Sequence, residues 1–339
     1  MNKSLLFASV WKHHFHSASR HGLASLRPVD TAPPSPRGFP DIQAFQQKAL
    51  IPKKPLFFQK DAGSPTVYLP ALSKWFNKAP SSGPSIPISP SLIENFQEWP
   101  FPYELIRSSR KEDSVALFRN SLMSSSEMTD QIMAGILQSA VTEGSDKRFF
   151  QVYSPLRLLI KALEYNASRD PDVTDPLQLY IAQSALPDLP QPLRDDLPAP
   201  EFVQRAGKGD IYSSSIWLGT EPTYTPLHRD PNPNLFCQLY SQKVVRLVPP
   251  SVGDRLFFEV QVQIRQRGNS RIRTTDMMEG EERKVLHDAV WESESLPDDM
   301  FEVKLDAGDA LFIPEGWWHS VKSVKSDGGL NGSVNWWFR

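Results

Sequence analysis

Two short stretches of the chain carry side chains that could bind a metal ion. The first, TPLHRDPNPN, contains His228 and Asp230. Residues i and i+2 of an extended strand project to the same face, so this imidazole and this carboxylate can converge on one ion. The second, LFIPEGWWHSV, places His319 after a short apolar run and a tight Pro-Glu-Gly turn. Two histidines and one carboxylate leave three positions of an octahedron open, which is typical of non-haem Fe(II) sites that bind a cosubstrate and O2.

Each of these residues also fits a purely structural role. His228 and Asp230 could form a hydrogen-bonded pair in a turn, and His319, beside two tryptophans, could be a core histidine. Beyond the first 29 residues the chain has one further histidine, His287, which an aspartate follows in VLHDAVWESE. These two neighbours are an alternative metal pair, but an exposed loop histidine is the simpler interpretation.

The composition indicates a sizeable core. Of the 339 residues 40% are apolar and 11% aromatic, which is enough for one core of roughly 200–250 residues with additional helices. The formal net charge of -2 gives no sign of nucleic-acid or membrane-surface binding. Cys237 is the single cysteine, which excludes an intrachain disulfide and a cysteine-based zinc site. No apolar run approaches the ~20 residues that span a bilayer, so we expect no membrane partner.

The first 29 residues differ in character from the rest, because they contain no acidic residue. If this segment is helical, Lys12, His16 and Arg20 stack on one face, roughly opposite the apolar side chains. A basic, serine-bearing, amphipathic start is typical of a mitochondrial transit peptide, so we expect a mitochondrial location. The alternative is a disordered basic tail on a cytoplasmic or nuclear protein. The four histidines of this segment are assigned to the presequence and not to a metal site.

Residues 30–175 are expected to form a flank that supports the rest of the fold. The abundance of proline and serine in residues 30–100 predicts one or two strands, one of them around Pro55–Phe58, joined by long loops. Further on, the apolar spacing of QIMAGILQSA and SPLRLLIKALEYNAS predicts helices. Ser154 is the expected N-cap of the second helix, before Pro155.

Residues 176–339 show a different period, with short runs rich in β-branched and aromatic residues between turn residues. This pattern predicts a β-sandwich or barrel, and the runs are QLYIAQSAL, SSSIWLG, PNLFCQLY, KVVRLVPP, FEVKL, ALFIP, HSVKSV and SVNWWF. The strongly polar stretch 261–299 is expected to be a long insertion between strands.

This part of the chain resembles the JmjC (cupin-like) 2-oxoglutarate oxygenases. The resemblance rests on WLGTEPTYTPLHRDPNPNLFCQLYSQKVVRLVPP, AGDALFIPEGWWHSVKSV and the ending SVNWWF, in that order. It is greatest to the small stand-alone JmjC hydroxylases, such as the asparaginyl hydroxylase that acts on hypoxia-inducible factor, and the arginyl hydroxylases. It implies a mainly β, double-stranded β-helix (jelly-roll) core with a helical, loop-rich flank before it. It also implies that His228, Asp230 and His319 bind Fe(II).

The resemblance assigns five further residues to 2-oxoglutarate. Lys243 matches the lysine that pairs with the distal carboxylate of this cosubstrate, and Thr225 and Tyr180 match hydroxyl groups on the same carboxylate. Asn234 and Asn335 match polar residues near the metal-bound end. Considered alone, each residue also fits a structural role in a turn, a strand or the core.

The implied activity is the oxidative decarboxylation of 2-oxoglutarate by O2, coupled to hydroxylation of a substrate. We expect the substrate to be a side chain of an unidentified protein, with an RNA base as an alternative, and no DNA-reader module accompanies the site. N-methyl-lysine demethylation is a second alternative, and a non-catalytic cupin-like binding protein is a third, from another class. Trp217, Trp317 and Trp318 could shield the reactive centre, although core packing is the simpler role.

Overall fold

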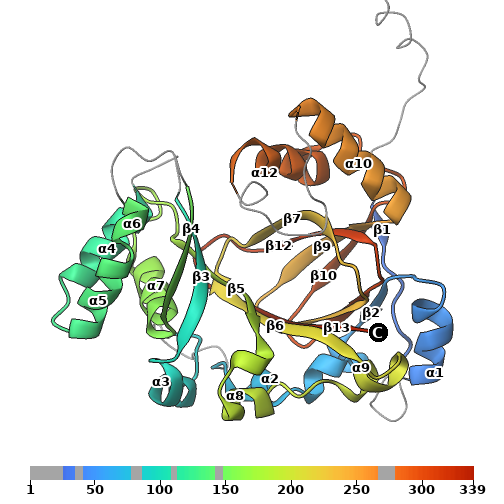
Figure 1. The fold of residues 1–339 in the computed structure, drawn as a ribbon, viewed down its shortest axis with the longest axis horizontal. Helices are drawn as coiled ribbons and strands as arrows, with labels where there is room; N and C mark the ends of the chain where they lie inside the picture. The colour runs from blue at the N-terminus through green and yellow to red at the C-terminus, as the bar shows by residue number, and fades with distance from the viewer. Residues whose placement is uncertain (1–25, 35–40, 78–85, 108–112, 142–147, 266–278) are drawn as a thin grey trace, which may run out of the picture.

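Two β-sheets form the centre of the molecule (Figure 1). The structure is a computed structural model, and it describes residues 26–34, 41–77, 86–107, 113–141, 148–265 and 279–339. Most of the expected transit peptide therefore lies outside the described residues. Among the described residues no helix is both long enough and apolar enough to cross a membrane.

The smaller sheet has five strands in the order β1-β10-β9-β12-β7. Their bounds are Arg27–Pro28 for β1, Phe301–Leu305 for β10, Lys243–Val248 for β9, Trp318–Ser323 for β12 and Tyr224–Arg229 for β7. All neighbours are antiparallel except β1, which pairs in parallel with β10. Strand β7 is thus an edge strand, and it carries His228.

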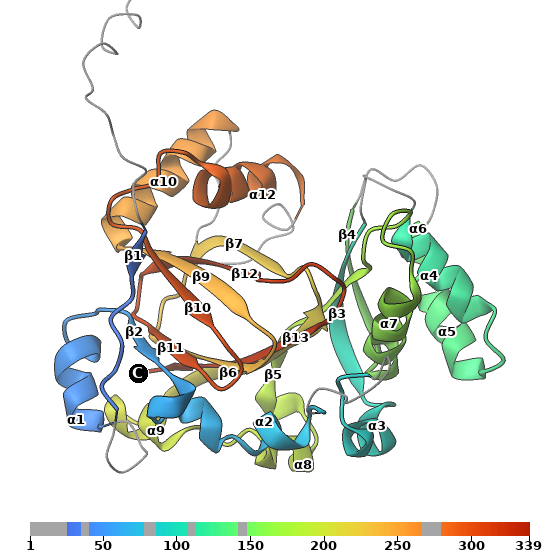
Figure 2. The same cartoon turned by 180° about the vertical axis from the view of Figure 1, so that it is seen from behind.

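The larger sheet has eight strands in the order β2-β11-β8-β13-β6-β5-β3-β4. Their bounds are Leu56–Phe58, Ala310–Ile313, Asn234–Tyr240, Leu330–Phe338, Ile211–Thr220, Gln178–Ala185, Pro100–Ile106 and Phe149–Pro155, in that spatial order. Seen from behind, β13 and β6 run beneath β9, β10 and β12 (Figure 2). Two facing, largely antiparallel sheets confirm the predicted jelly-roll core with its helical flank.

Alternation along the strands separates an apolar outer face from a mixed inner face. In β8, Leu235, Cys237 and Leu239 belong to the main hydrophobic core on the outer side of the larger sheet. In β13, Val334 and Trp336 belong to the same core. The residues between them must then point to the space between the two sheets, where the chain places its polar side chains.

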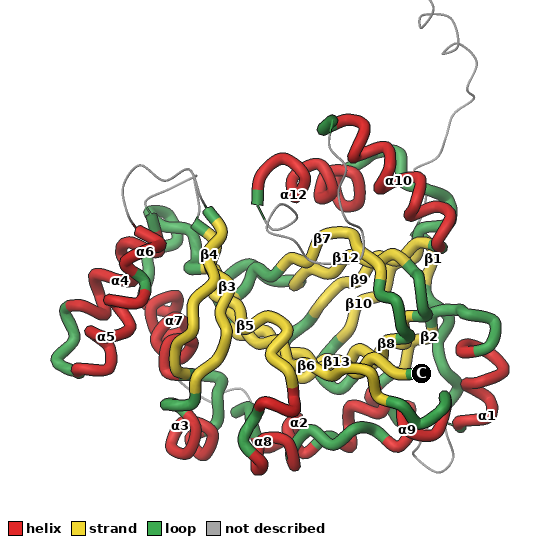
Figure 3. The backbone as a smooth tube through the Cα atoms, viewed as in Figure 1, coloured by secondary structure: helices red, strands yellow, loops and turns green. Residues whose placement is uncertain are grey.

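Helices cover the outer faces of both sheets (Figure 3). Helices α4 to α7 pack beside β3 and β4, while α1, α2, α8 and α9 lie beneath the larger sheet. Their bounds are Ser114–Met123, Met128–Ile136, Gln138–Val141 and Arg157–Ser168, then Ile42–Phe45, Pro70–Lys74, Gln191–Asp195 and Glu201–Ala206. A further helix, α3, spans Pro90–Phe96, with Ser89 accepting the Leu92 amide as its N-cap.

Two expectations about local structure were wrong. Ser154 lies in strand β4 and does not cap a helix, because the chain stays extended through Pro155 before α7 begins at Arg157. Residues 30–100 contain helices α1, α2 and α3 in addition to the expected strand near Pro55–Phe58. The polar stretch 261–299 lies in the connection between β9 and β10, and its described part is mainly helical. Helix α10 (Pro250–Gln263) ends in it, and α12 (Gly280–His287) follows.

Helices α10 and α12 cover the smaller sheet, and Gly253 permits the close approach of α10. A Cβ atom at this position would lie 2.2 Å from Cγ of the buried Trp318. We expect Gly253→Ala to destabilise the fold by about 1–3 kcal/mol through overpacking. Gly135, in α5, is the matched control, because nothing lies within 4 Å of its Cβ position. Gly135→Ala should be neutral or stabilising by up to about 1 kcal/mol.

Urea unfolding of the two variants and the wild type measures these free energies. Equal midpoints for Gly253→Ala and Gly135→Ala would contradict the close contact between α10 and Trp318.

Candidate metal centre

Three potential metal ligands meet at one end of the space between the sheets. His228 lies opposite His319 in the pairing of β7 with β12, and their ring centroids are 4.2 Å apart. Asp230 follows directly after β7, with Oδ2 3.6 Å from Nε2 of His319. One ligand atom from each of the three residues lies within 4.8 Å of the others. The structure thus brings together the three residues that the sequence singled out.

The backbone fixes which nitrogen of each imidazole is available. Nδ1 of His228 lies 2.8 Å from the carbonyl oxygen of Pro226, and Nδ1 of His319 lies 3.1 Å from that of Trp317. A carbonyl only accepts a hydrogen bond, so each Nδ1 carries a proton, and in the neutral imidazole the lone pair then lies on Nε2. Neutral imidazoles held in this way are the form that binds a divalent metal ion.

The carboxylate of Asp230 is held by two donors. The indole Nε1 of Trp337 donates to Oδ2 at 2.7 Å, and Nδ2 of Asn234 donates to the same oxygen at 3.1 Å. Asn335 in turn donates to Oδ1 of Asn234 at 2.9 Å. The two asparagines, which the resemblance assigned to the metal-bound end of 2-oxoglutarate, are thus joined to Asp230 by a hydrogen-bonded chain.

Trp337 and Ser333 were not singled out from the sequence. Both are two residues from Asn335 along β13, so all three side chains share the inner face of the sheet. The same i+2 rule that linked His228 to Asp230 could have found them. Alternation in SVNWWF was the available signal.

Lys243 lies on the inner face of the smaller sheet. It pairs with Ser323, two residues from Val321 and four from His319 along β12, so these side chains share one face. The Lys243 side chain is only 2% exposed. Its Nζ donates to Oγ of Ser333 at 2.9 Å and to Oη of Tyr180 at 3.2 Å. A buried ammonium among hydroxyl groups is a suitable receptor for an anionic group.

Thr225 reaches the inner face through a β-bulge. Thr225 pairs with Val321 and His228 pairs with His319, so β7 has one more residue than β12 between these pairs. In a regular strand Thr225 and His228, three residues apart, would point to opposite faces. The extra residue reverses the alternation, so Thr225 shares the face of His228.

The three tryptophans take different positions. Trp217 pairs with Ser333 and so stands on the inner face, with its ring 5.9 Å from that of Tyr180. Trp318 points to the opposite side, into a cluster with α10 and α12. Trp317 packs among buried apolar residues of both sheets. Core packing therefore describes Trp317 and Trp318, whereas Trp217 borders the site.

His287 is not an exposed loop residue, as the simpler interpretation had it. It is the last residue of α12, and its ring packs edge-on against Tyr224 at 5.1 Å. Burial, followed by the positive charge of Lys322, lowers the pKa of His287. Among the described residues His287 and Asp288 join no third metal-ligating group.

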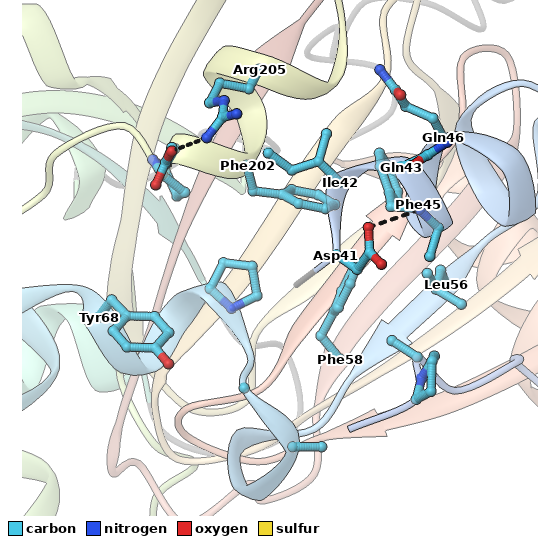
Figure 4. A pocket seen from close by; sticks show the side chains of 18 of the residues that line it. Asp41, Ile42, Gln43, Phe45, Gln46, Leu56, Phe58, Tyr68, Phe202 and Arg205 are labelled. Atoms are coloured by element: carbon cyan, nitrogen blue, oxygen red, sulfur yellow. Dashed lines mark hydrogen bonds and ion pairs between the residues drawn. The ribbon is translucent and has the colours of Figure 1, made fainter. Parts of the chain in front are cut away.

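A cavity of about 1190 Å³ lies away from this centre, at α1, β2 and α9 (Figure 4). Phe45, Phe58 and Phe202 form its apolar wall. Pro34 and Asp41, which flank a stretch outside the described residues, are also part of its lining. None of the metal-ligating residues lines it, so the volume of this cavity does not bear on the chemistry of the three ligands.

The residues of the centre fit a divalent metal and a dicarboxylate cosubstrate. The ligand set supplies two imidazole nitrogens and one carboxylate. Each of these side chains is oriented by a hydrogen bond to a neighbouring group. The buried Lys243 provides a cation on the same inner face as His319. Tyr180 and Ser333 orient that cation, and Thr225 adds a hydroxyl on the same face.

Comparisons with known proteins agree with this geometry. A family model described as a cupin-like domain matches residues 88–339. Lysine-specific demethylase JMJ30 of Arabidopsis thaliana is 30% identical over 159 residues, which are 47% of this chain and 33% of that protein. JmjC domain-containing protein D of Dictyostelium discoideum is 30% identical over 172 residues, covering 48% and 36%.

A vertebrate relative gives a similar match. Lysine-specific demethylase 8 of Danio rerio is 28% identical over 161 residues, covering 47% of this chain and 36% of that protein. The matched region is thus about a third of the length of these relatives.

Proposed function

The chain belongs to the cupin-like family of JmjC proteins, and we propose that it is an Fe(II)- and 2-oxoglutarate-dependent dioxygenase that hydroxylates a side chain of a protein. Family membership supports a 2-oxoglutarate-dependent oxygenase in general. The observation that carries the proposal is the joint presence of the His228–Asp230–His319 group and the buried Lys243 on one inner surface.

We assign a role to each residue from the family resemblance and from its position. Nε2 of His228, Nε2 of His319 and the carboxylate of Asp230 hold Fe(II). Lys243 pairs with the distal carboxylate of 2-oxoglutarate, and Tyr180 and Thr225 add hydroxyl donors to it. Bound Fe(II) supplies the activation of O2 and the conversion of 2-oxoglutarate to succinate and CO2. The ring of Trp217 lies beside that of Tyr180, where it would shield this side of the site from water.

Demethylation of N-methyl-lysine is the second candidate, because several relatives are named lysine-specific demethylases. The two reactions differ in their products. Hydroxylation adds one oxygen atom that stays in the substrate, whereas demethylation removes a methyl group as formaldehyde.

Incubation of the chain with Fe(II), 2-oxoglutarate, isotopically heavy O2 and an extract of mitochondrial matrix proteins and RNA separates these candidates. Hydroxylation predicts a protein whose mass increases by one heavy oxygen atom, in a reaction that Asp230→Ala abolishes. Release of formaldehyde with loss of a methyl group would instead support the demethylase, and oxidised RNA would support the base hydroxylase.

A mitochondrial location is part of the proposal, supported by the acid-free, basic first 29 residues. A fluorescent reporter carrying residues 1–29 should enter mitochondria. A diffuse cytoplasmic or nuclear signal would contradict import and would leave the oxygenase proposal intact.

A further inference from the structure

We propose that Trp337 is a positioning residue for Asp230, and that its indole N–H holds this carboxylate in the orientation in which it faces the two histidines. The inference rests on the proposed function, because it requires Asp230 to be a metal ligand. It extends that function by assigning a role to a residue whose side chain is not itself a metal ligand.

The two donors on Asp230 converge on one oxygen. Trp337 donates to Oδ2 at 2.7 Å, and Asn234 donates to Oδ2 at 3.1 Å. Oδ2 is also the oxygen that lies 3.6 Å from Nε2 of His319. The two donors therefore set the direction in which this carboxylate faces the histidines.

The orientation of the neighbouring amides follows from the charge of Asp230. An ionised carboxylate only accepts hydrogen bonds, so Asn234 must present its NH2 group to Oδ2. Oδ1 of Asn234 consequently accepts from Asn335 at 2.9 Å. Oδ1 of Asn335 is then left as a buried acceptor with no hydrogen-bond partner among the described residues. The hydrogen-bonded chain of the two asparagines therefore ends in an acceptor atom, Oδ1 of Asn335. Trp337 is the donor to Asp230 that is not part of this chain.

Backbone pairing on both sides fixes the position of Trp337. It lies in β13, which is paired on both sides, with Ser213 of β6 and with Asn234 of β8. The Trp337 side chain is 8% exposed. Phenylalanine at this position would keep the ring contacts and remove only the N–H donor, so Trp337→Phe isolates the hydrogen bond.

Titration with Co(II), in the absence of 2-oxoglutarate, measures this role without any turnover. Loss of an outer-shell hydrogen bond to a ligand weakens metal binding by about 10–100-fold, so we expect this loss for Trp337→Phe. Trp336→Phe is the matched control, because Trp336 is also buried but faces the hydrophobic core. The Co(II) affinity of Trp336→Phe should stay within about threefold of the wild type, a much smaller change than the loss expected for Trp337→Phe.

A second replacement at position 337 controls for an effect of misfolding on Co(II) binding. Site-specific incorporation of benzothienylalanine at position 337 replaces the N–H by sulfur in a ring of nearly the same shape. Weaker Co(II) binding with an unchanged melting temperature of the metal-free protein supports the proposal. Wild-type affinity in this variant would overturn it and leave the proposed function standing. A wild-type chain that binds no Co(II) would overturn both.

Discussion

Replacing His319 by alanine is expected to abolish tight Fe(II) binding by this chain. The Nε2 atom of His319 is one of three ligand atoms, and two remaining ligands hold a divalent ion poorly. Loss of an outer-shell partner already costs about 10–100-fold in metal affinity, so loss of a ligand should cost more than 100-fold. Anaerobic calorimetry with Fe(II) measures the affinity directly.

The matched control is His287→Ala. His287 is half-buried and carries an imidazole, but it lies at the end of α12 and outside the three-residue group. Fe(II) should raise the melting temperature of the wild type and of His287→Ala, because a ligand that binds only the folded state stabilises it. His319→Ala should show no such rise. An equal rise in all three proteins would place the metal elsewhere.

Replacing Lys243 by methionine is expected to remove 2-oxoglutarate binding while leaving metal binding intact. Methionine fills a similar volume without a charge, so the buried site should remain packed. Truncating one partner of a buried, hydrogen-bonded charge pair costs about 2–5 kcal/mol, which corresponds to about 30-fold or more in affinity. Calorimetry with 2-oxoglutarate in the presence of Mn(II) measures this loss.

Lys304→Met is the control for removing a lysine from a strand. Lys304 is an exposed residue of β10, and it pairs with Val244, so it faces away from the centre. Its 2-oxoglutarate affinity should equal that of the wild type. If Lys243→Met also retained wild-type affinity, the buried ammonium would have a purely structural role.

The metal ligands could be predicted from sequence because they depend on short-range geometry. His228 and Asp230 need only an extended chain to converge, and the turn before His319 sets the start of β12. Lys243 depends on longer-range register, and there the resemblance to a known family supplied what alternation alone could not. Its contacts with Tyr180 and Ser333 join strands from two different sheets.

Other features depend on tertiary context. The bulge in β7 places Thr225 on the inner face. Pro226 lies within it, but a proline in a strand fits either a bulge or an edge position, so the sequence alone did not locate the bulge. Ser154-Pro155 has the pattern of a helix start, but pairing of β4 with β3 keeps this dipeptide extended. Recognising the role of Trp337 requires both the sequence and the structure. Alternation in the sequence puts it on the inner face, but only the structure shows that its N–H donates to Asp230.

The most direct test of the central claim is succinate formation from 2-oxoglutarate by the purified chain with Fe(II), ascorbate and O2. This family's chemistry commonly includes slow turnover without a substrate, so no partner need be known. We expect succinate from the wild type and none from Asp230→Ala or Lys243→Met. Wild-type protein that forms no succinate and binds no 2-oxoglutarate would contradict the oxygenase assignment and favour a non-catalytic binding protein.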